Sequence, residues 1–405
     1  PEEDFPVDEP NLSDTNIDYE TAAGSINAFA WDLYQQLIAA KPGENVFFSP
    51  YSISTALAMT YAGAKEQTKE QMAEVLNYDP PDEQLHAGFG QLQNHLDGEG
   101  EERNYVLNVA NALWAQEGYA FLNEYFDLVE QYYGSALYGV DFINATEQTR
   151  QTINTWVEEK THDKIKDLIP EGALSKITRL VLTNAIYFKG TWKIQFVEED
   201  TEDDPFWISS QDYIMAPMMR MTDTFNYWSN DHCKMLELPY DGEELSMIII
   251  LPHEREGLEF LEQSLSSATI DDWLTQLTSR KVQVYLPKFE LTDMCKLKDI
   301  LSQMGMPIAF SNGADFSGMV DMSIPRNDDG VKIGEVLHKA FIEVNEEGTE
   351  AAAATAVIMV GITSVGDSPP PLPIFRADHP FVYLIRDNLS GSILFLGRMM
   401  NPVTE

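Results

Sequence analysis

Residues 338–361 read HKAFIEVNEEGTEAAAATAVIMVG, and this stretch decides how the chain is interpreted. Side chains alternate from Phe341 to Asn345 as they do in a β-strand, and Gly348 then permits a turn. A run of small residues, Ala351–Ala354, follows the turn, and the chain later resumes as FRADHPFVYLI at residues 375–385. The pattern predicts a strand, a long mobile loop and a second strand.

The first half of this loop consists almost wholly of small residues, whereas surface loops normally carry polar turn residues. At strand spacing, one face would hold Thr349, Ala351, Ala353, Thr355, Val357 and Met359, and the other Glu350, Ala352, Ala354, Ala356, Ile358 and Val360. The alanines are equally typical of an exposed helix. The preceding glycine and the following β-branched residues favour a loop that can become a strand.

The segment resembles the hinge and reactive-centre loop of the serpins, and other parts of the chain resemble that family in the same order. The resemblance spans roughly residues 22–402. Its further motifs are NVFFSPYSI from Asn45, LTNAIYFKGTW from Leu182, LPY from Leu238, LPKF from Leu286, DFSGM from Asp315, HPF from His379 and FLGRMMNP from Phe395.

The resemblance implies an α+β fold in a single domain at residues 22–405. That domain would have a large central mixed β-sheet, two smaller sheets, eight or nine helices and an exposed reactive-centre loop. The hinge and this loop would occupy residues 346–374. Residues 1–21 form an acidic tail, which we predict to be disordered because it holds few apolar residues. The tail also indicates a mature or trimmed N-terminus.

Hydrophobic periodicity independently predicts a mixed fold. The expected helices are Ala22–Ala40, Ile53–Tyr61 with Ser49 as its cap, and Thr146–Thr161. The expected strands are Leu180–Lys189, Leu245–Leu251, Val282–Leu286 and Phe381–Ile385.

The charge is extreme, with 66 Asp and Glu against 26 Lys and Arg and a net charge of −40. Such a surface repels nucleic acid and anionic membranes, and its scattered basic residues argue against a heparin site. The acidity fits either a protein adapted to high salt or an acidic secreted protein. No apolar run is long enough to span a membrane, and we expect a secreted monomer.

Signs of enzyme chemistry are few. The chain has no GxSxG, HExxH or GxxxxGK motif, and its seven histidines are not clustered as metal ligands are. We expect no catalytic residues, no cofactor and no metal. Cys233 and Cys295 lie far apart, which favours two buried free thiols over a disulfide, although one bridge stays open.

The resemblance implies suicide inhibition of a serine protease, or of a cysteine protease. The protease would form an acyl-enzyme with the loop. The cleaved loop would then insert into the main sheet and distort the tethered protease. The family's hinge maps to Glu346, Gly348, Thr349, Ala351, Ala352, Ala353 and Ala354. Its breach, at the top of the sheet, maps to Trp192, Lys288 and Glu346, and its shutter, in the middle, to Ser52, Asn184 and His338. Lys288 could also be an ordinary strand-end lysine, and His338 a satisfied core histidine.

The reactive bond is placed by counting. In the family it usually follows the seventeenth residue from the hinge glutamate, which gives Ile362–Thr363, within one or two residues. No Lys or Arg lies between Lys339 and Arg376, so an elastase-like or subtilisin-like target fits better than a trypsin-like one. The stretch after the bond is longer than usual and ends in the proline-rich segment 369–373.

Two other functions remain open at this point. A non-inhibitory serpin that acts as a carrier, chaperone or storage protein would be cut as a plain substrate. An unrelated enzyme would turn over a substrate. The hinge lacks the bulky or charged residues that non-inhibitory serpins often carry, which favours the inhibitory type.

Overall fold

The computed structural model describes residues 19–98, 103–134, 136–324, 331–349 and 372–403. Over these residues the chain forms nine α-helices and two β-sheets, so the predicted α+β class is confirmed. The helices are α1 (Tyr19–Ala40), α2 (Pro50–Tyr61), α3 (Glu66–Leu76), α4 (Asp82–Asp97), α5 (Asn123–Tyr133), α6 (Thr146–Lys160), α7 (Leu258–Glu262), α8 (Ser267–Thr275) and α9 (Lys298–Met304). Two short 3-10 turns, η1 (Glu198–Asp200) and η2 (Pro307–Phe310), complete the helical elements of the described chain.

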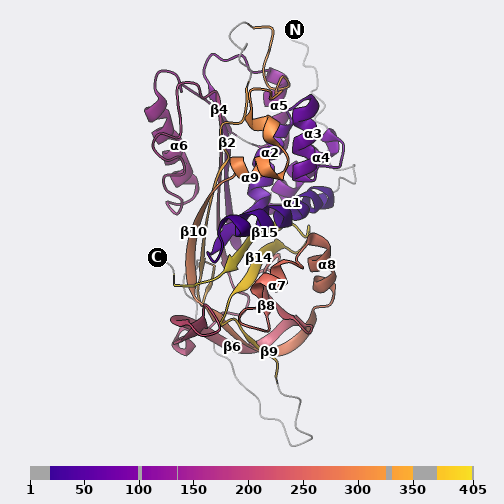
Figure 1. Ribbon diagram of the computed structural model, residues 1–405, viewed down its shortest axis with the longest axis vertical. Coiled ribbons are helices and arrows are strands. Elements are labelled where there is room, and N and C mark those ends of the chain that lie inside the picture. Colours follow the sequence, from indigo (N-terminus) through magenta and orange to yellow (C-terminus); the bar gives the residue numbers. More distant parts are fainter. Residues whose placement is uncertain (1–18, 99–102, 135, 325–330, 350–371, 404–405) are drawn as a thin grey trace, which may run out of the picture.

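A six-stranded mixed sheet, called here the central sheet, runs along the long axis of the molecule (Figure 1). Helix α6 packs on one side of it, and α1 to α5 lie on the other. Its strands, in spatial order, are β10 (Phe289–Lys296), β11 (Leu337–Val344), β12 (Gly348–Thr349), β4 (Leu180–Thr191), β2 (Tyr105–Gln116) and β3 (Ala136–Val140). Strand β11 also pairs directly with β4, in parallel.

The second sheet has nine strands, and β6 (Tyr213–Ser229) is its connecting element. Strand β6 pairs with β5 through its first residues, with β9 through its middle and with β7 through its last four residues. The family resemblance predicted two separate smaller sheets, but in the structure their strands are hydrogen-bonded into a single sheet. The remaining strands are β1 (Val46–Phe48), β5 (Glu202–Trp207), β7 (Cys233–Pro239), β8 (Leu245–Pro252), β9 (Thr278–Pro287), β13 (Ile374–Arg376), β14 (Phe381–Asp387) and β15 (Ile393–Met399).

Burial explains why the central elements form where they do. All twelve residues of α2 are buried, and so are all residues of β8 and β15. Ser49 caps α2, because its side chain accepts a hydrogen bond from the Ser52 N–H while Pro50 occupies the first turn. The main hydrophobic core joins the helices to both sheets, and a smaller core lies between α6 and the central sheet.

The predicted elements are present with shifted ends. Helix α1 begins at Tyr19 rather than Ala22, and β9 begins at Thr278 rather than Val282. Most of the acidic tail lies outside the described residues. Cys233 and Cys295 are buried free thiols, as expected, and burial raises the pKa of each to about 12. Within the described ranges, no helix combines the length and apolar character that crossing a membrane requires.

Candidate functional site

The hinge residues Gly348 and Thr349 form a two-residue strand, β12, between β11 and β4. Strand β12 is antiparallel to both neighbours, with Thr349 opposite Gly190 on β4 and opposite Val344 on β11. The preceding turn is held by Asn345, whose side-chain oxygen accepts hydrogen bonds from the backbone N–H groups of Glu347 and Gly348 at 3.1 and 3.2 Å. This is the local turn chemistry that asparagine supplies.

Gly348 is required by the close approach of β4. A Cβ atom at this position would lie 2.1 Å from the backbone oxygen of Gly190, and backbone cannot move aside as a flexible side chain can. Glycine therefore lets the chain enter the gap between the two strands.

Thr349 is already buried in the uncleaved chain. Its side chain is fully enclosed, and its Oγ1 lies 2.8 Å from the hydroxyl of Tyr240. The Tyr240 ring in turn stacks on Trp192, with centroids 4.6 Å apart and planes 13° from parallel. Thr349 therefore already lies inside the central sheet, between β11 and β4.

The structure brings the expected breach residues together beside this hinge. Lys288 Nζ lies 2.7 Å from Glu346 Oε2, and Thr201 Oγ1 donates to Glu346 Oε1 at 2.8 Å. Trp192 donates from its indole nitrogen to the backbone oxygen of Asn345 at 3.0 Å. Burial alone would raise the pKa of Glu346, but the hydrogen bonds from Lys288 and Thr201 outweigh it and lower that pKa.

Next to this inserted hinge, β4 and β11 pair directly. Residues Leu337–Phe341 of β11 lie beside Thr183–Tyr187 of β4 in parallel register. In a parallel pair the hydrogen bonds are slanted and slightly less stable per residue than in an antiparallel pair. This parallel pair is therefore a comparatively weak part of the central sheet.

The expected shutter residues meet within this parallel pair. His338 lies opposite Asn184 in the register, and its Nδ1 is hydrogen-bonded to Asn184 Oδ1. The Asn184 amide donates to Ser52 Oγ at 2.7 Å and to Asn111 Oδ1 at 2.9 Å. Four elements, α2, β2, β4 and β11, are thus joined through one buried asparagine.

His338 is held as a neutral imidazole. The backbone N–H of Ser49 donates to His338 Nε2 at 3.0 Å, so the ring proton is on Nδ1 and points to Asn184. Complete burial lowers the pKa of His338 to about 3. To become charged, the ring would have to bind a second proton at Nε2, and the hydrogen bond that this atom accepts from Ser49 would be lost.

Three residues of this site were not identified from the sequence. Asn111 is a polar residue inside the apolar strand β2, and that contrast was the available signal. Tyr240 ends the LPY motif, but nothing in the motif indicates a contact with Thr349. Thr201 lies in an acidic segment, and nothing in the sequence around it indicated a contact with Glu346. The remaining candidates, Ala351, Ala352, Ala353, Ala354, Ile362 and Thr363, lie outside the described residues.

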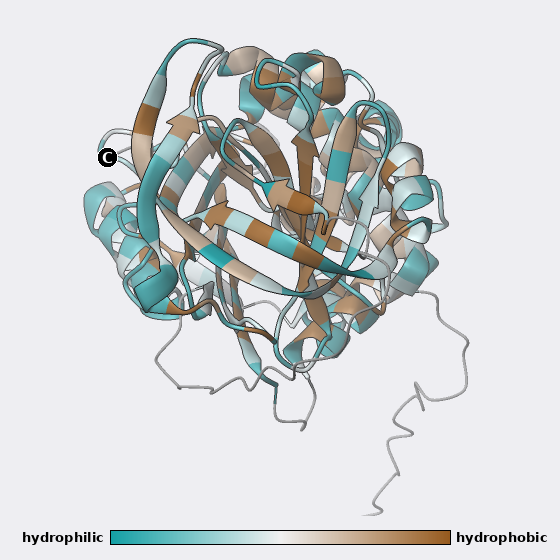
Figure 2. Ribbon diagram, turned by 90° about the horizontal axis from the view of Figure 1, so that it is seen from below, coloured by the Kyte–Doolittle hydropathy of each residue, from teal (hydrophilic) through white to brown (hydrophobic). Residues whose placement is uncertain are grey.

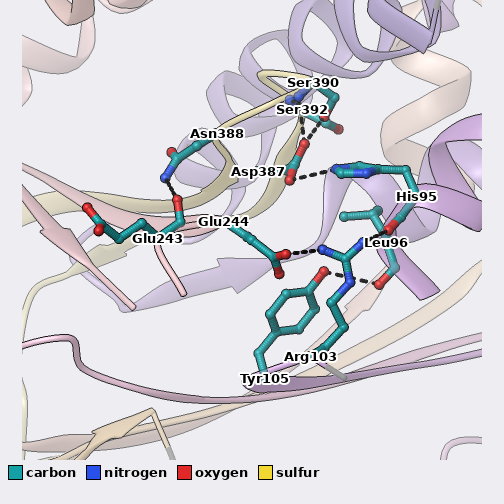
Figure 3. Close-up of polar contacts among 10 residues, drawn as sticks. All are labelled: His95, Leu96, Arg103, Tyr105, Glu243, Glu244, Asp387, Asn388, Ser390 and Ser392. Atoms are coloured by element: carbon teal, nitrogen blue, oxygen red, sulfur yellow. Dashed lines mark hydrogen bonds and ion pairs between the residues drawn. The ribbon is translucent and has the colours of Figure 1, made fainter. Parts of the chain in front are cut away.

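A second buried polar cluster surrounds Asp387 at the end of β14 (Figure 3). Asp387 accepts hydrogen bonds from the Ser390 backbone and hydroxyl, and His95 Nε2 lies 3.1 Å from its Oδ1. Arg103 donates to the backbone oxygen of His95 at 2.6 Å and forms an ion pair with Glu244. These contacts connect the end of α4 to the turn between β14 and β15. The cluster therefore has a structural role.

Comparison with known proteins identifies the family. The family model described as Serpin (serine protease inhibitor) matches residues 24–402, so the chain belongs to the serpin family. A leukocyte elastase inhibitor from Xenopus tropicalis is 40% identical over 390 residues, covering 95% of this chain and 100% of the relative. An uncharacterized serpin-like protein from Thermococcus kodakarensis is 43% identical, covering 93% and 85%. The solved structure of human thyroxine-binding globulin with thyroxine aligns with a TM-score of 0.84 at 30% identity, covering 95% and 100%.

Proposed function

We propose that this protein is a suicide inhibitor of serine proteases, which traps the acyl-enzyme by inserting its cleaved loop between β4 and β11. The observation that carries the proposal is the position of the hinge. Gly348 and Thr349 already lie between these two strands. Further along each strand, from Tyr187 and Phe341 onward, β4 and β11 pair directly. This position supports a mechanism in which the rest of the freed loop continues the same strand and separates the paired part.

Insertion in the present register has a definite geometry. Thr349 lies opposite Gly190 and Val344, so each further residue moves one place down β4 and one place down β11. Residue 355 would then arrive opposite both Asn184 and His338. The parallel β4–β11 contact would become two antiparallel contacts, which are slightly more stable per residue. This gain supports a metastable uncleaved state whose best-packed form follows cleavage.

The target is an elastase-like or subtilisin-like protease. The expected reactive bond, Ile362–Thr363, offers a β-branched aliphatic residue, and the loop holds no basic residue for a trypsin-like pocket. The printed name of the Xenopus relative, leukocyte elastase inhibitor, supports the same class. We further propose that the protein is a secreted monomer without enzymatic turnover of its own.

The decisive experiment mixes the protein with elastase-like, subtilisin-like and trypsin-like serine proteases and separates the products on denaturing gels. An inhibitor gives a covalent complex that survives SDS. A carrier, chaperone or storage serpin gives clean cleavage without a complex, and that result would overturn the proposal. If no protease cleaves the chain or forms a complex with it, the result would favour the third possibility, an unrelated enzyme.

A further inference from the structure

The hairpin formed by β5 and β6 exposes large apolar side chains on adjacent positions. Ile208, Tyr213 and Met215 are 41%, 53% and 49% exposed. Tyr213 lies opposite Trp207 in the strand register, and their ring centroids are 5.2 Å apart. Single exposed apolar residues are common on protein surfaces, but a contiguous group marks an interaction site. We call these four residues the hairpin surface.

Strand β5, which leads into the hairpin surface, contacts the residues on both sides of the reactive-centre loop. At one end of β5, Thr201 donates to Glu346 in the hinge at 2.8 Å. At the other end, the backbone N–H of Trp207 donates at 2.7 Å to the backbone oxygen of Asp378, which follows β13. Strand β5 thus spans from the residues that precede the loop to those that follow it. Figure 2 looks onto this end of the molecule.

The chain that leads into the hairpin surface is strongly acidic. Residues 194–212 contain seven acidic residues and no Lys or Arg. Two of the acids are paired, Glu202 with Arg220 and Asp204 with Arg376. The other acids of the segment 198–203 are exposed and form no ion pair among the described residues. We call these four residues, Glu198, Glu199, Asp200 and Asp203, the acidic border. A third arginine, Arg255, covers the Trp207 ring at 3.5 Å from its centroid.

We propose that the hairpin surface and its acidic border form an exosite for a basic, partly apolar surface beside the active site of the attacking protease. The inference rests on the proposed function, because a protease must approach the loop to reach this surface. The carboxylates increase the rate of encounter with a basic protease by electrostatic attraction. The apolar side chains orient the protease and act at any salt concentration.

Charge selects this partner over the other candidates. A second copy of the chain brings a net charge of −40 and would be repelled, as would nucleic acid. A basic protein surface is complementary to the four unpaired carboxylates and to the apolar centre together. The exosite therefore sets which of two proteases with the same primary specificity is captured faster.

Paired variants of the full-length protein test the exosite. Glu198→Lys with Glu199→Lys reverses part of the acidic border, and Tyr213→Ser with Met215→Ser removes the apolar centre. The matched control is Glu124→Lys with Glu130→Lys on α5, which are exposed and lie at the opposite end of the molecule (Figure 1). The measured quantity is the second-order rate constant of covalent complex formation with a basic elastase, in low and in high salt.

The border variant should lower this rate about 10-fold at low salt and hardly at all in about 1 M NaCl, because salt screens exposed charges. The apolar variant should lower it by a similar factor at both salt concentrations, since burial of apolar area does not depend on screening. The stoichiometry of inhibition should stay unchanged for both. An equal loss in the α5 control, or no loss in either exosite variant, would overturn the proposal.

Binding to an elastase whose catalytic serine is replaced by alanine separates the exosite from the inhibitory mechanism. If the wild-type protein forms no covalent complex with active elastase, the proposed function fails. The exosite then still stands if the hairpin variants weaken binding to the inactive elastase and the α5 control does not. If all variants bind the inactive elastase equally, the exosite fails whatever the outcome with active protease.

Discussion

Asn184 on β4 and His338 on β11 lie directly opposite each other, and their side chains share a hydrogen bond where the two strands pair. Both residues are buried, so separating them would leave polar groups without partners unless another group supplied one. If the loop inserts as proposed, continuing the present register would bring residue 355 to this position, and the sequence has a threonine there. The inserted loop would then carry a hydroxyl group to the place where this hydrogen bond is lost.

The first prediction follows from this arrival of Thr355. Thr355→Val should lower the thermal midpoint of the loop-cleaved form, by an amount equivalent to about 1–2 kcal/mol, because a buried donor or acceptor of the shutter stays unsatisfied. The uncleaved form should melt as the wild type does. Thr355→Ser, which keeps the hydroxyl, is the control. Equal midpoints of the cleaved Val and Ser variants would show that residue 355 does not reach the shutter.

A second prediction concerns pH. Burial lowers the pKa of His338 to about 3 in the folded protein, against about 6.5 in an unfolded chain. The stabilisation is complete above about pH 6.5. It is lost as the pH falls toward 3, because the unfolded chain binds a proton that the folded protein rejects. The expected slope is about 1.4 kcal/mol per pH unit for this one group.

His86 adds to the same trend, since burial lowers its pKa to about 4. The urea midpoint of unfolding, measured between about pH 7 and pH 5, should therefore fall for the wild type. His86→Gln should keep roughly half of the slope, which is the part due to His338. His232→Gln, at an exposed position, should behave as the wild type. A midpoint that is flat over this range would contradict the neutral, buried His338.

The hinge gives the third prediction. Thr349 is fully buried against Tyr240, so Thr349→Arg would place a charge in the sheet without a partner, at a cost of several kcal/mol. The hinge should leave the sheet, insertion should slow, and the protein should be cleaved as a substrate. The ratio of covalent complex to cleaved inhibitor on a denaturing gel measures this. Thr349→Ser should trap protease normally, and an unchanged ratio for the Arg variant would refute insertion at Thr349.

The sequence predicted those parts of the fold that depend on local signals. Helix α2 was located because Ser49 and Pro50 form a cap and first turn before an apolar run. Strand β6 was missed because Pro217 interrupts it and its exposed and buried residues do not alternate regularly along its length. Pairing across β6 also decides whether the smaller sheets are joined, and such long-range pairing leaves no mark in a local pattern.

The candidate site was predicted through family resemblance rather than periodicity. Lys288 and Glu346 belong to different motifs, and only the fold brings their charges to 2.7 Å. The burial of Thr349 could not be predicted, because it depends on the close approach of Gly348 to the backbone of Gly190. Gly190 also has to be small, since a Cβ there would meet the rings of Phe188 and Tyr240. The polar contacts of Asn111 with Asn184 and of Tyr240 with Thr349 likewise join residues that are far apart in the sequence, so no local pattern indicates them.

The fourth prediction concerns stability after cleavage. Cutting the loop near Ile362 should raise the thermal midpoint sharply, because the freed segment replaces the parallel β4–β11 contact with two antiparallel ones. Nicking an ordinary surface loop leaves the midpoint unchanged or lowers it. Calorimetry of the intact and cleaved protein makes the comparison, with Thr349→Arg as a control that should gain less on cleavage. A cleaved form that melts at or below the intact one would contradict loop insertion.

The fifth prediction concerns specificity at the reactive bond. Ile362 should occupy the primary pocket of an elastase-like protease, where affinity follows buried apolar area at about 25 cal/mol per Å². Ile362→Arg should lose elastase-like targets and gain trypsin-like ones, because a buried arginine needs the carboxylate that a trypsin-like pocket supplies. Ile362→Val should keep the elastase-like targets and serves as the matched control.

Mass spectrometry of the released C-terminal fragment tests this assignment independently of the rates. A fragment that begins at Thr363 would place the bond as counted from Glu346. A fragment that begins one or two residues away would mean that a neighbouring residue occupies the primary pocket. The substitution by arginine should then be made at that residue instead of Ile362. A fragment that begins after Pro369 would mean that the segment before the bond is longer than the seventeen residues counted from Glu346. In that case the counting argument would be wrong, and the target class would have to be inferred from the residue found at the cut.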